Sequence, residues 1–157
     1  RTLRERRGGG HELLAFRNGK AWRDIRSTDI NRYVKEATGG DHSAKDFRTW
    51  NATVLAAVAL AAGARENPPR SKAARARAKP LAVKEVARYL GNTPAVSRSS
   101  YIDPRIFDRF DGGLTIGGVF ERLPDDPADW PEVQGPIERA VLDLIARRDS
   151  ASVERIR

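Results

Sequence analysis

The stretch LGNTPAVSRSSY, residues 90–101, predicts the end of one helix, a sharp turn and a second short helix. Gly91 follows the last apolar residue of the first helix, at the position where helices often end with a glycine of positive φ. Thr93 and Pro94 form the pattern of an N-cap followed by proline at the first helical position. Tyr101 then lies about two turns further along the second helix. Such a junction is common by itself, and a tyrosine on it would more often pack than react.

A second stretch, AKDFRTW at residues 44–50, predicts the start of a long helix. Ser43 is suited to cap this helix, since its side chain can accept a hydrogen bond from the first turn. The apolar residues that follow recur at spacings of three and four, the period of a buried helical stripe. The predicted stripe consists of Phe47, Trp50, Val54 and Val58.

Two cations, Lys45 and Arg48, lie off the centre of that stripe in the first turns of the helix. An anion would also be attracted there by the free N–H groups of the helix start. The turn of the first stretch adds the amide of Asn92, and its second helix adds the phenol of Tyr101. Two cations, an amide donor and a phenol together suit a phosphodiester substrate.

In this order the two stretches resemble the C-terminal catalytic part of a bacterial type IB DNA topoisomerase, and the likeness extends over most of residues 12–111. The tyrosine recombinases share this architecture, but their usual pattern has histidine where this chain has Lys45 and Asn92. The resemblance implies a mainly α protein. It would have the helical catalytic domain of the type IB topoisomerase/tyrosine recombinase fold, with a small β-hairpin near the N-terminus.

The resemblance also implies the chemistry, which is relaxation of supercoiled DNA through a 3′-phosphotyrosyl intermediate. Tyr101 would be the nucleophile, Arg48 would stabilise the charge of the transition state, and Asn92 would donate to a non-bridging oxygen. A covalent link of this kind conserves the energy of the phosphodiester, so neither a nucleotide nor a metal cofactor is expected. Three further positions match phosphate contacts of the family and are expected to bind DNA: Lys45, Ser97 and Arg98.

The family also uses an earlier arginine and a general-acid lysine on a β-hairpin, and both normally precede the point where this chain begins. Lys20 lies beside an Asn18-Gly19 hairpin signal, but that hairpin matches the segment after the family's lysine hairpin. We therefore expect a fragment that is inactive in isolation and acts with the remainder of the same enzyme, the N-terminal part of a clamp. The expected substrate is duplex DNA, bound by a monomer.

Charge and composition agree with a nucleic-acid partner. The 157 residues include 29 Lys+Arg and 21 Asp+Glu, with a net charge of +8, and the excess is confined to residues 1–120. A basic surface attracts polyanions, although an arginine-rich composition alone would look the same. Cysteine is absent, which excludes disulfides and thiol chemistry. No apolar run is long enough for a membrane span and no signal peptide is visible, so we expect a cytoplasmic, nucleoid-associated protein.

The remaining chain is predicted as follows. Residues 1–123 would form the main part of the helical domain, and 64–80, rich in proline and cations, would be a mobile basic loop. Residues 124–157 would be an acidic, proline-rich loop and a C-terminal helix, with the end from Asp149 fraying. A helix over 28–37 is expected to bury Tyr33.

Two other classes of protein stay open at this point. A tyrosine recombinase would use the same covalent step in a synaptic tetramer. A non-catalytic basic helical DNA-binding module would keep the basic surface and bury the phenol of Tyr101.

Overall fold

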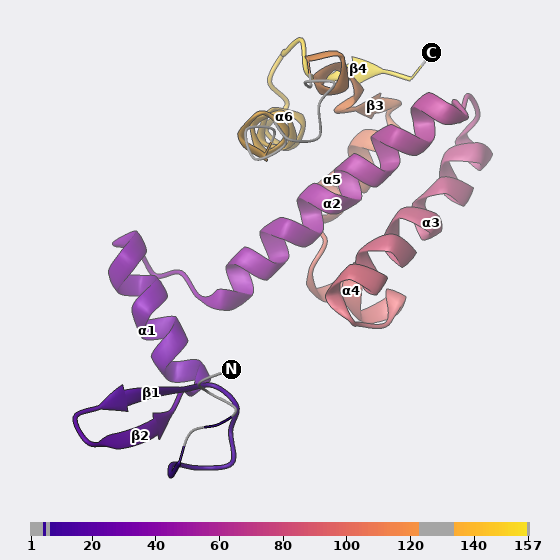
Figure 1. Cartoon of the computed structure of the whole chain (residues 1–157). Helices are drawn as coiled ribbons and strands as arrows, with labels where there is room; N and C mark the ends of the chain where they lie inside the picture. The colour runs from indigo at the N-terminus through magenta and orange to yellow at the C-terminus, as the bar shows by residue number, and fades with distance from the viewer. Residues whose placement is uncertain (1–4, 6, 123–133, 157) are drawn as a thin grey trace. The chain divides into compact units, whose positions relative to one another are not determined.

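The computed structural model describes residues 5, 7–122 and 134–156, and within them the chain is mainly α with a small antiparallel hairpin near its N-terminus. This confirms the predicted fold class. The chain forms two compact units, Arg1–Phe47 and Arg48–Arg157 (Figure 1). The unit boundary thus lies near residue 47, and the C-terminal helix belongs to the same unit as the helices of the predicted site. Most of the predicted acidic loop, residues 124–133, lies outside the described residues.

The first unit contains the hairpin and one helix. Strands β1 (Ala15–Asn18) and β2 (Ala21–Asp24) pair antiparallel, and Asn18 lies opposite Ala21. The two-residue loop is therefore Gly19-Lys20, one position later than the Asn18-Gly19 signal indicates. Gly19 has φ +61°, which a glycine adopts without the steric cost that a Cβ would bring.

Helix α1 (Ser27–Thr38) ends at Gly39, whose φ of 67° is the left-handed conformation of a helix cap. The predicted burial of its apolar face is wrong. No residue of α1 is buried, and Tyr33 is 70% exposed. The spacing of three and four does give the helix an apolar side, but the hairpin is too small to cover it.

Helix α2 (Ala44–Glu66) supplies the centre of the second unit's core with a face that differs from the predicted stripe. Phe47 is 51% exposed, and Trp50, Val54 and Val58 only border the core. Small side chains let neighbouring elements approach the backbone closely, so the helix turns its alanine face inward. The buried residues of α2 are Ala52, Thr53, Ala56, Ala57, Leu60, Ala61 and Ala64.

Helix α3 (Lys72–Leu90) runs antiparallel to α2 after a short connection (Figure 1). Its start corrects the prediction of a basic loop over 64–80, because α2 continues to Glu66 and only 67–71 lie between the helices. Ser71 caps α3 by accepting a hydrogen bond of 3.1 Å from the N–H of Ala74. Alanines and long cations favour a helix. The Nζ of Lys79 also lies 2.6 Å from Oδ2 of Asp111, which ties α3 to a later helix.

Two short helices follow, α4 (Pro94–Ser100) and α5 (Pro104–Asp111). Both begin with the predicted combination of a capping side chain and proline at the first position, from Thr93 and Asp103. Their contacts place α3 against α4 and α5. The apolar side of α5, Ile106, Phe107 and Phe110, is buried in the core.

The C-terminal part closes the same core. Helix α6 (Gln134–Ala146) packs on α5 and on the 3₁₀ helix η1 (Gly117–Arg122), and strand β4 (Glu154–Arg155) pairs with β3 (Leu114–Thr115). The predicted fraying from Asp149 is therefore wrong. The N–H of Ile156 donates to the carbonyl of Gly113 at 2.9 Å. A Cβ on Gly118 would lie 2.4 Å from the carbonyl oxygen of Ala151, so this close approach requires glycine.

Within the described residues, no helix is long and apolar enough to cross a membrane.

Candidate active site around Tyr101

The turn between α3 and α4 has the geometry that its sequence predicts. Gly91 ends α3 in the left-handed conformation, with φ 67° and ψ 32°. The N–H of Asn92 then donates to the carbonyl of Ala87 at 3.0 Å, which closes the end of α3. On the other side of the turn, Oγ1 of Thr93 accepts a hydrogen bond of 3.3 Å from the N–H of Val96. Both helix ends are thus satisfied, and Asn92 is held between them.

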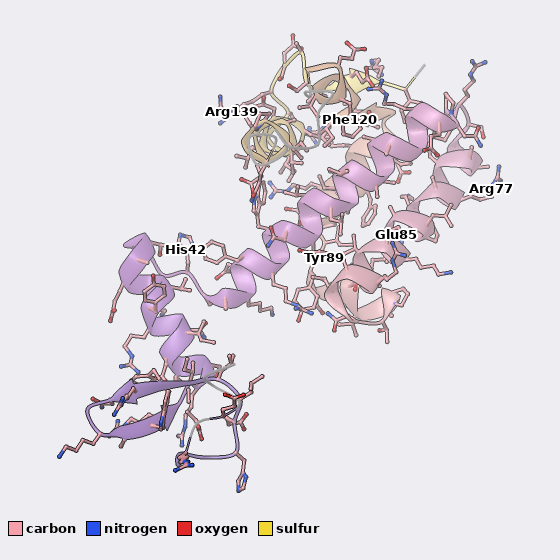
Figure 2. The ribbon with its side chains drawn as sticks, viewed as in Figure 1. His42, Arg77, Glu85, Tyr89, Phe120 and Arg139 are labelled. Atoms are coloured by element: carbon pink, nitrogen blue, oxygen red, sulfur yellow. The ribbon has the colours of Figure 1, made fainter. Side chains whose placement is uncertain are left out.

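Tyr101 follows α4 as its C-cap residue, and its N–H donates to the carbonyl of Ser97 at 3.2 Å. Its side chain is half-buried against the core. The other two tyrosines, Tyr33 on α1 and Tyr89 on α3, are each 70% exposed. Tyr89 is labelled in Figure 2. Tyr101 is therefore the tyrosine that the fold holds in a defined environment, with its ring only partly covered.

Arg48 connects the two stretches from which the site was predicted. One of its terminal nitrogens donates a hydrogen bond of 2.5 Å to the carbonyl of Leu90, the last residue of α3. Its Cζ also lies 5.2 Å from the centroid of the Tyr101 ring, within range of a cation–π interaction. The guanidinium is thus fixed between the end of α3 and the phenol. Since a guanidinium has five N–H donors, one bond to Leu90 leaves others for an anion.

The amide of Asn92 brings a donor to the same turn. Its Nδ2 is shielded from solvent and has no hydrogen-bond acceptor among the described residues. A buried donor without a partner is unfavourable, and native structures contain few of them. An anion bound at the turn would supply the missing acceptor, which agrees with the predicted role of Asn92.

The three residues predicted to contact phosphate differ in how far they are exposed to solvent. Ser97 is fully buried in α4, and its Oγ has no partner among the described residues, so its hydroxyl is not presented to solvent. Arg98 is exposed, and its Cζ lies 5.1 Å from the centroid of the Phe107 ring. Lys45 is exposed in the first turn of α2 and belongs to the first unit. DNA contact by these residues stays a prediction.

Thr53 is a residue of the site that the sequence analysis did not identify. It is 2% exposed on α2, and its hydroxyl donates to the carbonyl of Thr49 at 2.9 Å. The same Oγ1 accepts a hydrogen bond of 3.0 Å from the N–H of Asp103, and lies 3.4 Å from the carbonyl oxygen of Tyr101. The helix that carries Arg48 is therefore fastened directly to the backbone on both sides of Ile102. The sequence feature that could have identified Thr53 is a hydroxyl residue within the alanine-rich face of α2.

Asp103 fixes the segment after Tyr101. Its Oδ1 accepts a hydrogen bond of 2.9 Å from the N–H of Arg105 and so caps α5. The Arg105 guanidinium also donates to both oxygens, with a shortest distance of 2.6 Å. These hydrogen bonds hold the pKa of the Asp103 carboxyl below its ordinary value, against the opposing effect of burial. The nucleophile candidate thus lies between two capped helices.

Comparison with known proteins agrees with this geometry. The family described as the catalytic core of eukaryotic DNA topoisomerase I matches residues 7–110, which contain every residue of the site described so far. The DNA topoisomerase 1B of Acanthamoeba polyphaga mimivirus is 29% identical over 106 residues. That alignment covers 68% of this chain and 31% of the relative, so the chain spans about a third of the relative's length.

Because the family match covers more than half of the chain, the protein belongs to the family of the eukaryotic DNA topoisomerase I catalytic core. This family membership favours a topoisomerase over the recombinase alternative.

Proposed function

We propose that this chain carries the nucleophile of a type IB DNA topoisomerase, and that Tyr101 forms the 3′-phosphotyrosyl intermediate. The observation that carries the proposal is the position of Arg48, which is fixed by Leu90 and lies 5.2 Å from the Tyr101 ring. A cation held beside a phenol favours both the approach of a phosphodiester and the charge that develops during its attack.

The proposed step is an in-line transesterification. The phenol of Tyr101 loses its proton to solvent and its oxygen bonds to phosphorus as the bond from phosphorus to the 5′-oxygen breaks, and the leaving oxygen takes up a proton. Arg48 and the Nδ2 of Asn92 donate to the non-bridging oxygens and so stabilise the negative charge of the transition state. A side-chain amide cannot act as a general acid or base at neutral pH, so the role of Asn92 is hydrogen bonding. After strand rotation, the freed 5′-hydroxyl attacks phosphorus, displaces the phenol and restores the phosphodiester.

The proton donor to the leaving oxygen is proposed to come from the remainder of the enzyme, together with a further arginine. The shared length of about a third of the mimivirus relative is consistent with this division. We therefore propose that the isolated chain binds duplex DNA without relaxing supercoils. The bacterial branch, action as a monomer on DNA and a cytoplasmic, nucleoid-associated location are part of the same proposal, and the Lys45 and Asn92 pattern supports the first of them.

The test uses a nicked suicide substrate and the complete enzyme, in which the covalent adduct accumulates because the short leaving strand diffuses away. Tyr101→Phe should abolish the adduct while leaving DNA affinity within about twofold. Tyr89→Phe is the matched control, because it removes a hydroxyl from an exposed tyrosine on the neighbouring helix and should leave the adduct unchanged. An adduct that persists in Tyr101→Phe would refute the assignment of the nucleophile.

A further inference from the structure

A hollow at the C-terminal end of α6 has no part in the proposed cleavage step. It lies among α5, the end of α6 and the strands β3 and β4, and mostly beyond the residues that the topoisomerase family matches. Its charged lining consists of Arg109, Arg147, Arg148, Arg155, Asp143 and Asp149. Four arginine residues in the lining of one hollow suggest an anion as its ligand.

The carboxylates of this hollow do not balance its cations. Asp143 forms an ion pair with Arg148, whose Nη1 lies 3.7 Å from Oδ1 of Asp143. Within the described part of the chain, the other three arginines of the lining, Arg109, Arg147 and Arg155, form no ion pair. Asp149 is the one remaining carboxylate of the lining, so the hollow has an excess of positive charge.

Arg109 is held in place at the wall of this hollow. Its Nε donates a hydrogen bond of 2.9 Å to the carbonyl of Leu144, near the end of α6. Burial and the nearby charge of Arg147 lower the pKa of Arg109, against the opposing effect of the Asp108 carboxylate. Arg109 is half-buried and Arg147 is exposed, and their like charges repel each other. An anion bound beside these two like charges would reduce their repulsion.

The backbone of Arg147 gives an independent indication. With φ 59°, it is the one non-glycine residue of positive φ among the described residues. The N–H of Arg148 donates to the carbonyl of Asp143 at 3.0 Å, the bond of a helix ending in which the preceding position is usually glycine. A long cation therefore occupies a position where glycine would be easier to accommodate. A residue that accepts such backbone strain is a candidate for a role of its side chain.

We propose that this arginine hollow binds an anion of the phosphate class, with Arg109 and Arg147 as its principal donors. The planar, forked guanidinium group matches the oxygens of a phosphate better than a lysine ammonium does. The bond from Arg109 to Leu144 leaves the terminal nitrogens of Arg109 available to the ligand. The site is distinct from Tyr101 and does not depend on the cleavage chemistry.

The test is a titration of the full chain with inorganic phosphate at constant ionic strength, followed by nuclear magnetic resonance of the backbone and of the arginine Nε–H groups. Signals of Arg109 Nε–H and of residues 147–155 should shift and saturate. Arg147→Gly should weaken the phosphate affinity at least fivefold without lowering the thermal midpoint, because glycine suits the backbone at this position. Arg155→Ala, on a different element, should also weaken the affinity.

Arg139→Ala is the matched control, since Arg139 is exposed on α6 (Figure 2) and is absent from the lining of the hollow. It should bind phosphate like the unchanged protein. The proposal fails if phosphate does not shift Arg109 Nε–H, if Arg147→Gly binds as tightly as the original chain, or if Arg139→Ala loses as much affinity.

A final comparison distinguishes two sources of this anion, a nucleic-acid phosphodiester and a free phosphate compound. If the ligand is a nucleic-acid phosphodiester, Arg147→Gly should weaken binding to a short duplex and make it less dependent on salt. If the ligand is a free phosphate compound, duplex affinity should stay the same while phosphate affinity falls. Either result supports the arginine hollow and assigns its ligand.

Discussion

The guanidinium of Arg48 donates to the carbonyl of Leu90, so the residue that faces the Tyr101 ring is itself held by the last residue of α3. This bond sets the direction of the remaining donors of Arg48 before any substrate binds. A group oriented in advance stabilises a transition state without a reorganisation cost. Arg48 is therefore predicted to act on the rate of cleavage more than on DNA affinity.

Replacement of Arg48 tests this directly. Arg48→Ala in the complete enzyme should lower the single-turnover cleavage rate by about 10²–10³, as the loss of a charge-stabilising donor typically does. Arg48→Lys should recover little, because an ammonium cannot bond to Leu90 and to a phosphate in the same geometry. Rates measured at saturating DNA separate cleavage from binding. A loss confined to affinity would mean that Arg48 only positions the DNA.

Asn92 is predicted to act as a hydrogen-bond donor. Asn92→His should retain most of the cleavage rate, because an imidazole N–H can donate from a similar position. Asn92→Ala should lose substantially more, since it removes the unpartnered Nδ2. The measurement is the rate of adduct formation at saturating DNA. Equal losses in both variants would show that the shape of the turn matters and that its donor does not.

Thr53 is predicted to be a positioning residue. Thr53→Val keeps the shape but removes the acceptor for the Asp103 N–H, so the segment that follows Tyr101 loses its attachment to α2. Cleavage at saturating DNA should fall while DNA affinity changes little. Thr53→Ser should restore the rate, because it restores the hydroxyl. A general loss of folding would instead lower the thermal midpoint of both variants and reduce DNA affinity together with the rate.

The Asp103–Arg105 pair predicts a dependence of stability on pH. Since the folded protein lowers the pKa of Asp103, the carboxylate stabilises the fold above the unfolded pKa of about 3.9. That contribution is lost as the pH falls through the lower, folded value. The thermal midpoint of the original chain should therefore exceed that of Asp103→Asn at pH 6, and the difference should shrink towards pH 2. A difference that is independent of pH would contradict this linkage.

The helical start of α3 predicts where trypsin cleaves the free protein. Arg70 lies in the short connection between α2 and α3, whereas Arg75, Arg77 and Lys79 lie within α3. Cleavage after Arg70 should precede cleavage after Arg75 and Arg77, because a protease needs an extended backbone. The bond after Lys79 is not a trypsin site, since Pro80 follows it. Mass spectrometry of early fragments gives the order. Early cuts at Arg75 or Arg77 would support the original prediction of a mobile loop.

Local rules were enough to predict the parts of the site that depend on nearby residues. The glycine end of α3, the Thr93-Pro94 start of α4 and the Asp103-Pro104 start of α5 were all readable from the sequence. A cap and its helix are adjacent in the chain, so their geometry follows from residue type. The start of α2 and the existence of the hairpin were predictable for the same reason.

Tertiary packing decided the remainder. The sequence predicted that α2 buries its larger apolar residues, but close contact between elements favours its alanine face, which also carries Thr53 inward to Asp103. The pairing of β3 with β4, each two residues long, carries no strong local pattern and depends on the glycines that let the C-terminal segment approach η1. The sequence alone thus identified Arg48, Asn92 and Tyr101 as candidates. Only the packing of α2 against the α3–α5 segment determined that Arg48 lies between Leu90 and Tyr101, because contacts between residues so far apart in the chain depend on the shape of the whole core.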